Sequence, residues 1–328
     1  MKKRYWLASG LALTGAALAA HRLLRPRALD WQAHADQLHH ADRSHFARVD
    51  GVRIHYQEAG EAAAPALVLV HGFLASNFIW RDVLVPLAAR GFRVIAPDLV
   101  GFGFSDKPAD GEYTIEYQAR KLVGLLDELN VRRATLVGSS YGGAVAAHAA
   151  FDYPERVARL VLVGAVCNDE LKRHPVLRLV ATPAVGDAVA PALLDLRYFL
   201  RRRLGVRRVP AGERARVESQ VAGRHLPLRA ADTQRAMLLT LRRWSATRVE
   251  REAHLLRQPT LIVWGADDPD TPLRDGETLH RLIPGSRLHV FPDTGHLPHE
   301  ERPAEFTELV AEFCKNGQEA EARSQKSE

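Results

Sequence analysis

The sequence contains very little cysteine. Only two of its 328 residues are cysteines, Cys167 and Cys314, and neither has C-x-x-C or zinc-ligand spacing. No H-E-x-x-H motif is present either. The sequence therefore predicts no metal site and no structural disulfide.

Lysine is also scarce, with 7 among the 45 basic residues, and the formal net charge of +6 comes from arginine. Residues 169–251 alone carry 18 Lys and Arg against 8 Asp and Glu. Such a segment could lie on an anionic membrane surface or attract acidic substrates, and a solvated face is the alternative. No zinc finger or aromatic-rich basic module accompanies it, so nucleic-acid binding is not predicted.

The sequence has one long run without charge, the sixteen residues from Tyr5 to Ala20, between the basic residues 2–4 and Arg22. A basic start, an apolar stretch and the small-x-small residues 17–19 are typical of an export signal. We expect residues 1–27 to be an uncleaved membrane anchor; cleavage and export to the periplasm is the alternative. A buried first helix is a third interpretation. Nothing in the sequence indicates an oligomeric state.

Beyond this segment the composition, 46% hydrophobic and 26% charged, allows a full buried core. Strand and helix patterns alternate over residues 46–315 and predict one α/β catalytic domain. Residues 28–45 read as a linker, and the charged residues 316–328 as a disordered tail. Within residues 169–256 the alternation gives way to helical periodicity interrupted by prolines, which predicts an inserted helical lid. Nine apolar lid residues could line an acyl pocket: Leu193, Leu194, Tyr198, Phe199, Leu200, Met237, Leu238, Leu241 and Trp244.

The most informative motif is the G-x-S-x-G pentapeptide at residues 138–142, which places Ser140 at its centre. Strand-forming residues precede it and helix-forming residues follow it, as a nucleophile elbow requires. The glycines allow a turn sharp enough to present the Ser140 hydroxyl at the end of a sheet. An ordinary strand–turn–helix link is the alternative interpretation of the pentapeptide alone.

Candidate partners for Ser140 follow in the order Ser, Asp, His. Asp268 comes after the strand-like residues 260–263, and His296 after the strand-like residues 287–291. A serine hydroxyl needs a base, and the base needs a carboxylate to orient it. Because the carboxyl ends of parallel strands meet at one edge of a sheet, three distant segments can converge there.

With these motifs the chain resembles the α/β-hydrolase family, in its branch of lidded serine hydrolases. The likeness spans most of residues 46–315 and rests on His71-Gly72-Phe73, residues 98–105, the pentapeptide, and the Asp268 and His296 segments. It implies a mostly parallel eight-stranded sheet flanked by helices, with an inserted lid. It further implies Ser140 as nucleophile, His296 as base and Asp268 as orienting acid, with the backbone N–H groups of Phe73 and Tyr141 as the oxyanion hole.

Each site residue has competitors. The W-G-x-x-D-x-x-x-P spacing favours Asp268 over Asp267 and Asp270, and some members of the family take the acid from a position where Asp169 stands. The glycine before His296 favours it over His299. His71 is expected to shape the oxyanion loop, and Asp98 to hold loops together by hydrogen bonds.

The resemblance implies a serine hydrolase that cleaves carboxylic esters of hydrophobic acyl groups or lipids without metal or organic cofactor. Thioester hydrolysis, C–C bond hydrolysis and cofactor-free perhydrolysis use the same triad and stay open. The dehalogenases and epoxide hydrolases of the family place Asp at the position of Ser140, which argues against both activities. A ligand-binding protein that has lost turnover is the alternative from a different functional class.

Overall fold

The computed structural model describes residues 26–190, 192–196 and 214–325. The predicted anchor therefore lies outside the described residues except for Pro26 and Arg27. Within the described part, no single helix is long and apolar enough to cross a membrane. Two helices that meet at a sharp bend, Pro175–Ala181 and Val185–Leu196, pass that test of length and composition together.

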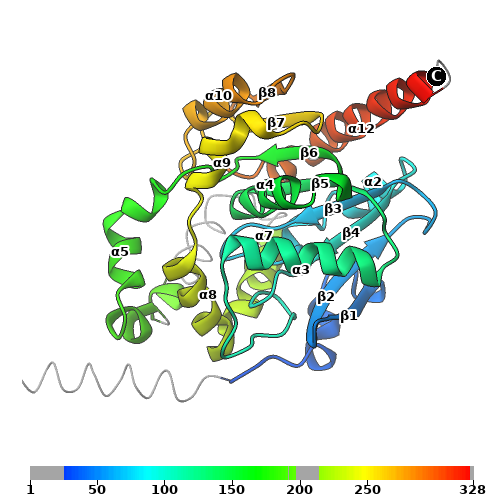
Figure 1. The fold of residues 1–328 in the computed structure, drawn as a ribbon. Coiled ribbons are helices and arrows are strands. Elements are labelled where there is room, and N and C mark those ends of the chain that lie inside the picture. Colours follow the sequence, from blue (N-terminus) through cyan, green and yellow to red (C-terminus); the bar gives the residue numbers. More distant parts are fainter. Residues whose placement is uncertain (1–25, 191, 197–213, 326–328) are drawn as a thin grey trace, which may run out of the picture.

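The centre of the molecule is an eight-stranded sheet of order β1-β2-β4-β3-β5-β6-β7-β8 (Figure 1). Only β1 and β2 run antiparallel to their neighbours, so the predicted mostly parallel sheet is confirmed. The strands are β1 Ser44–Val49, β2 Val52–Ala59, β3 Ala66–Val70, β4 Arg93–Pro97, β5 Ala134–Ser139, β6 Val157–Val163, β7 Thr260–Gly265 and β8 Arg287–Phe291. Asp50 and Gly51 join β1 to β2 with φ values of 47° and 79°, as a type I′ turn requires, and an Asp-Gly pair is typical of such turns.

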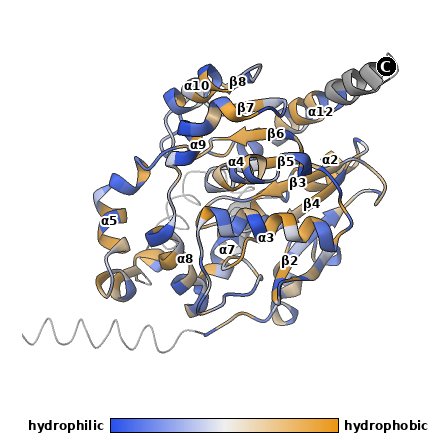
Figure 2. Ribbon diagram, in the orientation of Figure 1, coloured by the Kyte–Doolittle hydropathy of each residue, from blue (hydrophilic) through white to orange (hydrophobic). Residues whose placement is uncertain are grey.

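Helices cover both faces of the sheet, and an apolar core lies on each side (Figures 1 and 2). α3, α4 and α10 pack on one face, and α2 and α12 on the other. The α-helices are α2 Leu84–Ala88, α3 Ile115–Glu128, α4 Tyr141–Asp152, α5 Pro175–Ala181, α7 Arg214–His225, α8 Ala231–Arg243, α9 Thr247–Glu252, α10 Leu273–Leu282, α11 Pro298–Glu301 and α12 Pro303–Gln325. Residues 185–190 and 192–196 are helical as well.

Two segments outside the sheet differ in detail from expectation. The 28–45 linker contains two short 3-10 helices, Gln32–Gln37 and Ala41–Arg43, and β1 already begins at Ser44. α12 continues to Gln325 and so extends into residues 316–328, where a tail is expected from the sequence. Gln, Glu, Ala and Arg dominate that stretch, and such residues readily extend a helix that has already formed.

The segment between β6 and β7 carries α5, α7, α8 and α9, so the predicted insertion is helical where it is described. It leaves the sheet at the carboxyl end of β6, next to the end of β5. The insertion therefore begins at the edge where Ser140 lies.

Leu136 lies in the central strand β5 and is 1% exposed. We expect Leu136→Ala to lower the free energy of unfolding by about 2–5 kcal/mol, since it leaves a cavity between sheet and helices. The matched variant Leu282→Ala, at a side chain 36% exposed on α10, should change it by less than about 0.5 kcal/mol. Urea unfolding measures both, and equal losses would contradict the assignment of β5 to the core.

Candidate active site

Ser140 occupies the turn between β5 and α4, with φ 54° and ψ −119°. This left-handed conformation is unfavourable for a residue with a side chain, and the flanking glycines make it possible. A Cβ on Gly142 would lie 2.2 Å from the carbonyl oxygen of Val70, and one on Gly138 would lie 2.3 Å from that of Gly142. The local sequence therefore forms the sharp turn that the pentapeptide predicts.

Asp268 and His296 meet directly. His296 Nδ1 donates to Asp268 Oδ2 at 2.8 Å, and the Thr271 hydroxyl donates to the same oxygen at 2.9 Å. The Asp268 side chain is 1% exposed, whereas that of His296 is 14% exposed. Burial would raise the pKa of Asp268, but the hydrogen bond and charge of His296, together with the backbone N–H groups of Thr271 and Asp270, lower it. The carboxylate is therefore ionised and fixes the imidazole with Nε2 free to act.

Gly164, which directly follows β6, lies beside the Asp268–His296 pair. A Cβ there would lie 3.2 Å from both Asp268 Oδ2 and His296 Nδ1. The backbone N–H of Ser140 donates to the neighbouring Val163 carbonyl at 2.8 Å. All three predicted residues thus reach one edge of the sheet. Among the contacts of the described residues, no hydrogen bond joins the Ser140 hydroxyl to His296.

The competitors have other partners. The Asp169 carboxylate accepts the backbone N–H of Ala246 at 2.8 Å, which places it in the insertion. Asp270 only donates its backbone N–H to Asp268. His299 is fully buried against the Trp80 ring, with 4.1 Å between centroids, and burial lowers its pKa well below the ordinary value. The geometry favours Asp268 and His296.

Phe73 and Tyr141, the predicted oxyanion residues, approach Ser140 from two sides. Tyr141 is the first residue of α4, so its backbone N–H lies at a helix N-terminus. The loop after β3 brings Gly72 so close that a Cβ there would lie 3.1 Å from Ser140 Cβ. The Trp244 ring packs on Phe73 and on Tyr141, at centroid distances of 5.3 and 5.2 Å. Sequence reasoning placed Trp244 in an acyl pocket and missed this contact.

Comparisons with known proteins agree with this geometry. Residues 65–303 match the family model of the alpha/beta hydrolase fold. The chain belongs to the α/β-hydrolase family. It is 33% identical to the 2-hydroxymuconate semialdehyde hydrolase of Pseudomonas sp. strain CF600, over 80% of this chain and 90% of that protein.

Two solved structures are similar to this hydrolase. The enol-lactonase of Burkholderia xenovorans LB400 has a TM-score of 0.68 and 26% identity, and the match covers 83% of this chain and all of that one. A bacterial membrane phospholipase A has the same TM-score and identity, but covers 96% of this chain and 99% of that one.

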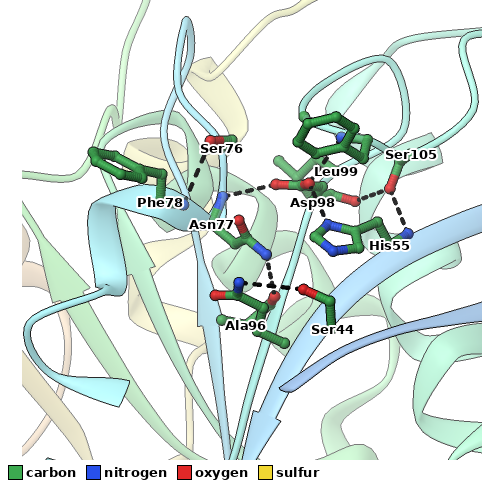
Figure 3. A network of polar contacts seen from close by, with 12 residues as sticks. Ser44, His55, Ser76, Asn77, Phe78, Ala96, Asp98, Leu99 and Ser105 are labelled. Atoms are coloured by element: carbon green, nitrogen blue, oxygen red, sulfur yellow. Dashed lines mark hydrogen bonds and ion pairs between the residues drawn. The ribbon is translucent and has the colours of Figure 1, made fainter. Parts of the chain in front are cut away.

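A second carboxylate–histidine pair supports the loops of the hydrolase. The Asp98 carboxylate is fully buried and accepts from His55 Nδ1 and from the Asn77 backbone N–H, both at 2.7 Å (Figure 3). It also accepts the backbone N–H of Phe104 at 2.9 Å. A Cβ on Gly103 would lie 2.0 Å from this carboxylate. Asp98 thus joins β2 to the loops after β3 and β4; sequence reasoning expected its role but missed His55.

His71 holds the predicted oxyanion loop from the other side. Its Nε2 accepts the backbone N–H of Leu99 at 3.0 Å, so the proton is on Nδ1, which donates to the Gly72 carbonyl at 2.8 Å. Burial lowers the pKa of His71, and the ring is neutral. Its expected structural role agrees with these contacts.

Burial would raise the pKa of Asp98, but the hydrogen bond from His55 and its other partners lower it from 3.8 to about 2. A carboxylate whose pKa is lower in the folded state stabilises the fold above its unfolded pKa, and this stability is lost as pH falls through the folded value. We expect the stability difference between the wild type and Asp98→Asn to shrink by about 2 kcal/mol between pH of about 4 and about 2. Urea unfolding at each pH measures it, and a constant difference would contradict the interpretation.

Proposed function

We propose that this α/β-hydrolase is a serine hydrolase of carboxylic esters with hydrophobic acyl groups or of lipid origin. The observation that carries the proposal is the 2.8 Å hydrogen bond between Asp268 and His296 beside the strained Ser140. A buried carboxylate that orients a partly exposed imidazole next to a serine at a sharp turn is the arrangement for nucleophilic acyl transfer.

Ser140, His296 and Asp268 each have a separate role in the proposed reaction. His296 Nε2 removes the proton as Ser140 Oγ attacks the ester carbonyl, and the Asp268 carboxylate stabilises the imidazolium that forms. His296 then protonates the leaving alcohol, which yields an acyl-enzyme on Ser140. Water hydrolyses this intermediate with His296 again as base. The hydrogen bond between Ser140 and His296 forms as substrate binds, since catalytic hydrogen bonds often shorten in the substrate complex.

The oxyanion is stabilised by the backbone N–H groups of Phe73 and Tyr141. A single donor of this kind contributes about 3–4 kcal/mol to lowering the barrier. The Asp98 and His71 contacts hold the loop that carries Phe73, so this donor is positioned before substrate arrives. Tyr141 is held by its place at the start of α4.

The acyl group would lie beneath the insertion at residues 169–256, which acts as the lid. Met237, Leu238, Leu241 and Trp244 are all buried there, and Leu194 is partly buried against the core. Leu193 is 39% exposed, and Tyr198, Phe199 and Leu200 lie outside the described residues. The apolar side chains around Trp244 favour a hydrophobic acyl group. Similarity to the phospholipase and the enol-lactonase supports ester chemistry.

Hydrolysis of a C–C bond is the second candidate, because a relative at 33% identity is a 2-hydroxymuconate semialdehyde hydrolase. The same serine and histidine would serve, and the lid side chains would select the substrate. Thioester hydrolysis and perhydrolysis differ only in the leaving group or the attacking nucleophile.

We expect the wild type to hydrolyse nitrophenyl esters and to be labelled by a fluorophosphonate, whereas Ser140→Ala should show neither.

His296→Ala should lose turnover by a factor of at least about 10⁴ while keeping the thermal unfolding of the wild type, because the base acts only in chemistry. Rates of hydrolysis are then compared for esters of increasing chain length, for thioesters and for a vinylogous diketone. The substrate class with the highest rate distinguishes ester, thioester and C–C hydrolysis. Absence of labelling would favour a non-catalytic binding protein.

Trp244→Ala removes the ring that packs on both oxyanion residues. A displacement of about 1 Å at the reacting groups can cost up to about 100-fold in rate. We therefore expect kcat for a short ester to fall by about that factor, and Trp244→Phe to restore most of it. Leu255→Ala, at a side chain 50% exposed in the same insertion, should leave kcat unchanged. Steady-state kinetics measure all three, and a change in KM alone would assign Trp244 only to substrate binding.

A further inference from the structure

Large exposed hydrophobic side chains gather on one part of the insertion. Within the described residues eight such side chains are exposed, and five of them lie between residues 176 and 196. We call these five the apolar patch: Val176 at 51%, Leu179 at 52%, Val185 at 40%, Leu193 at 39% and Leu196 at 53% exposure. Phe46, Leu255 and Leu282 are the three others and lie on separate elements. A cluster of this kind is typical of a binding surface.

The two helices that carry the apolar patch are short and meet at a sharp angle. α5 and residues 185–196 meet at an angle of 108°. A Cβ on Gly186 would lie 1.8 Å from the Val180 carbonyl oxygen, so the two helices touch at the bend. A twelve-residue helix measures about 18 Å, well below the roughly 30 Å of a bilayer core. The patch can therefore lie in a membrane surface but is too short to cross it in one straight helix.

The charges around the apolar patch favour an anionic surface. Asp187 pairs with Arg242 at 3.1 Å, and Asp195 with His225 at 3.4 Å. Glu170 likewise pairs with Arg274 at 2.6 Å. In contrast, Arg173 and Arg178 on the same segment are exposed, and their guanidinium groups have no ion pair or hydrogen bond among the described residues. Asp187 and Glu170 are thus paired with arginines of other elements, whereas the exposed Arg173 and Arg178 have no such partner among the described residues.

The N-terminal chain reaches the same part of the molecule. The carbonyls of Pro26 and Arg27 accept the backbone N–H groups of Ala231 and Asp232, the first residues of α8, at 2.9 and 3.0 Å. Near the other end of α8, Arg242 Nε donates to the Ala181 carbonyl at the end of α5 at 2.9 Å. These two contacts are about 16 Å apart along the helix. The 25 residues before Pro26, with their uncharged run 5–20, therefore join the protein close to the apolar patch.

An open cavity of about 290 Å³ lies between α5 and α8. Its lining combines apolar Leu177, Ala181 and Leu241 with the cations Lys172 and Arg178. Lys172 Nζ donates to the Trp244 carbonyl at 2.5 Å, so the cavity adjoins the residue whose ring covers Phe73 and Tyr141. An apolar cavity with cations in its wall suits an amphiphile with an anionic headgroup.

From these observations we infer that the apolar patch docks on the surface of a bilayer that contains anionic phospholipid. Val176, Leu179, Val185, Leu193 and Leu196 enter the interface, and Arg173 and Arg178 contact the phosphates. Docking brings the cavity between α5 and α8 to the membrane, so a lipid can enter it on the side of the insertion that carries Trp244. The membrane contact is independent of the proposed chemistry, and only the delivery of a lipid ester rests on it.

Site-specific labels on the full-length chain test the contact. Cys167 and Cys314 are each 1% exposed, and burial raises the pKa of both thiols, to about 11 for Cys314. Leu179→Cys and Leu196→Cys can therefore be labelled selectively with an environment-sensitive fluorophore, with Leu255→Cys and Leu282→Cys as controls of similar exposure. On vesicles of phosphatidylcholine and phosphatidylglycerol we expect a blue shift and quenching by brominated lipid for the two patch labels only. Equal response of all four labels, or of none, overturns the proposal.

Two controls separate the bilayer from other occupants. A blue shift of the Leu179 label that grows with protein concentration in the absence of vesicles would assign the patch to a second copy of the chain and overturn the proposal. Arg173→Glu with Arg178→Glu should weaken the response on anionic vesicles. Arg132→Glu should not, because this exposed residue precedes β5 at the opposite edge of the sheet. Equal effects would contradict the charge argument.

Turnover supplies a further test. Val176→Ser with Leu179→Ser should lower hydrolysis of vesicle phospholipid at least about tenfold, since two apolar side chains no longer enter the interface. Hydrolysis of a water-soluble nitrophenyl ester should stay as in the wild type. Equal loss on both substrates overturns the role in delivery. If the wild type hydrolyses neither, the proposed function fails, while the labels still report docking.

Discussion

The structure depends on one backbone constraint, the turn at Ser140, where β5 reverses into α4 through a left-handed serine. Such a conformation costs about 1–3 kcal/mol and persists only where the surroundings hold it. Here β6 holds it from both sides, because Ser140 donates to the Val163 carbonyl and its own carbonyl accepts the Val166 N–H. The close contact of Gly142 with Val70 ties the turn to β3 as well. Contacts with β3, β5 and β6 thus stabilise the strained turn. The turn places the Ser140 hydroxyl at the edge of the sheet.

The two carboxylate–histidine pairs show how burial separates structure from chemistry. His55 and Asp98 are 1% and 0% exposed, and the carboxylate is surrounded by donors from three segments, so no substrate can reach the pair. His296 is 14% exposed while its partner Asp268 is 1% exposed, so one imidazole nitrogen is held and the other is accessible. A carboxylate and a histidine therefore hold loops together at Asp98 and His55, which form the clamp, whereas at Asp268 and His296 they are candidates for catalytic acid and base. The clamp also supports the loop that presents Phe73 to Ser140.

Much of this arrangement could be predicted because its signals are local. The pentapeptide, the Asp50-Gly51 turn and the strand patterns each act within a few residues, and the parallel order of strands then brings Asp268 and His296 to one edge. Contacts that depend on packing between distant segments could not be predicted. His55 sits in an ordinary strand pattern, and only the fold shows that it faces Asp98. The contact of Trp244 with Phe73 and Tyr141 depends on how the inserted helices pack, and the helix over residues 316–325 depends on the preceding turns of α12.

One series of contacts runs through the insertion from the residues before α5 to the candidate site. Lys172, just before α5, donates to the Trp244 carbonyl, and the Trp244 ring packs on Phe73 and Tyr141 next to Ser140. The core itself is close-packed and resists movement. The segment that carries the apolar patch contacts α8 through the Asp187–Arg242 ion pair and the hydrogen bond from Arg242 to the Ala181 carbonyl, while Leu194 packs against the core. Trp244 is 1% exposed and packs on both Phe73 and Tyr141, so the packing of the inserted helices bears directly on the loop and the helix start beside Ser140.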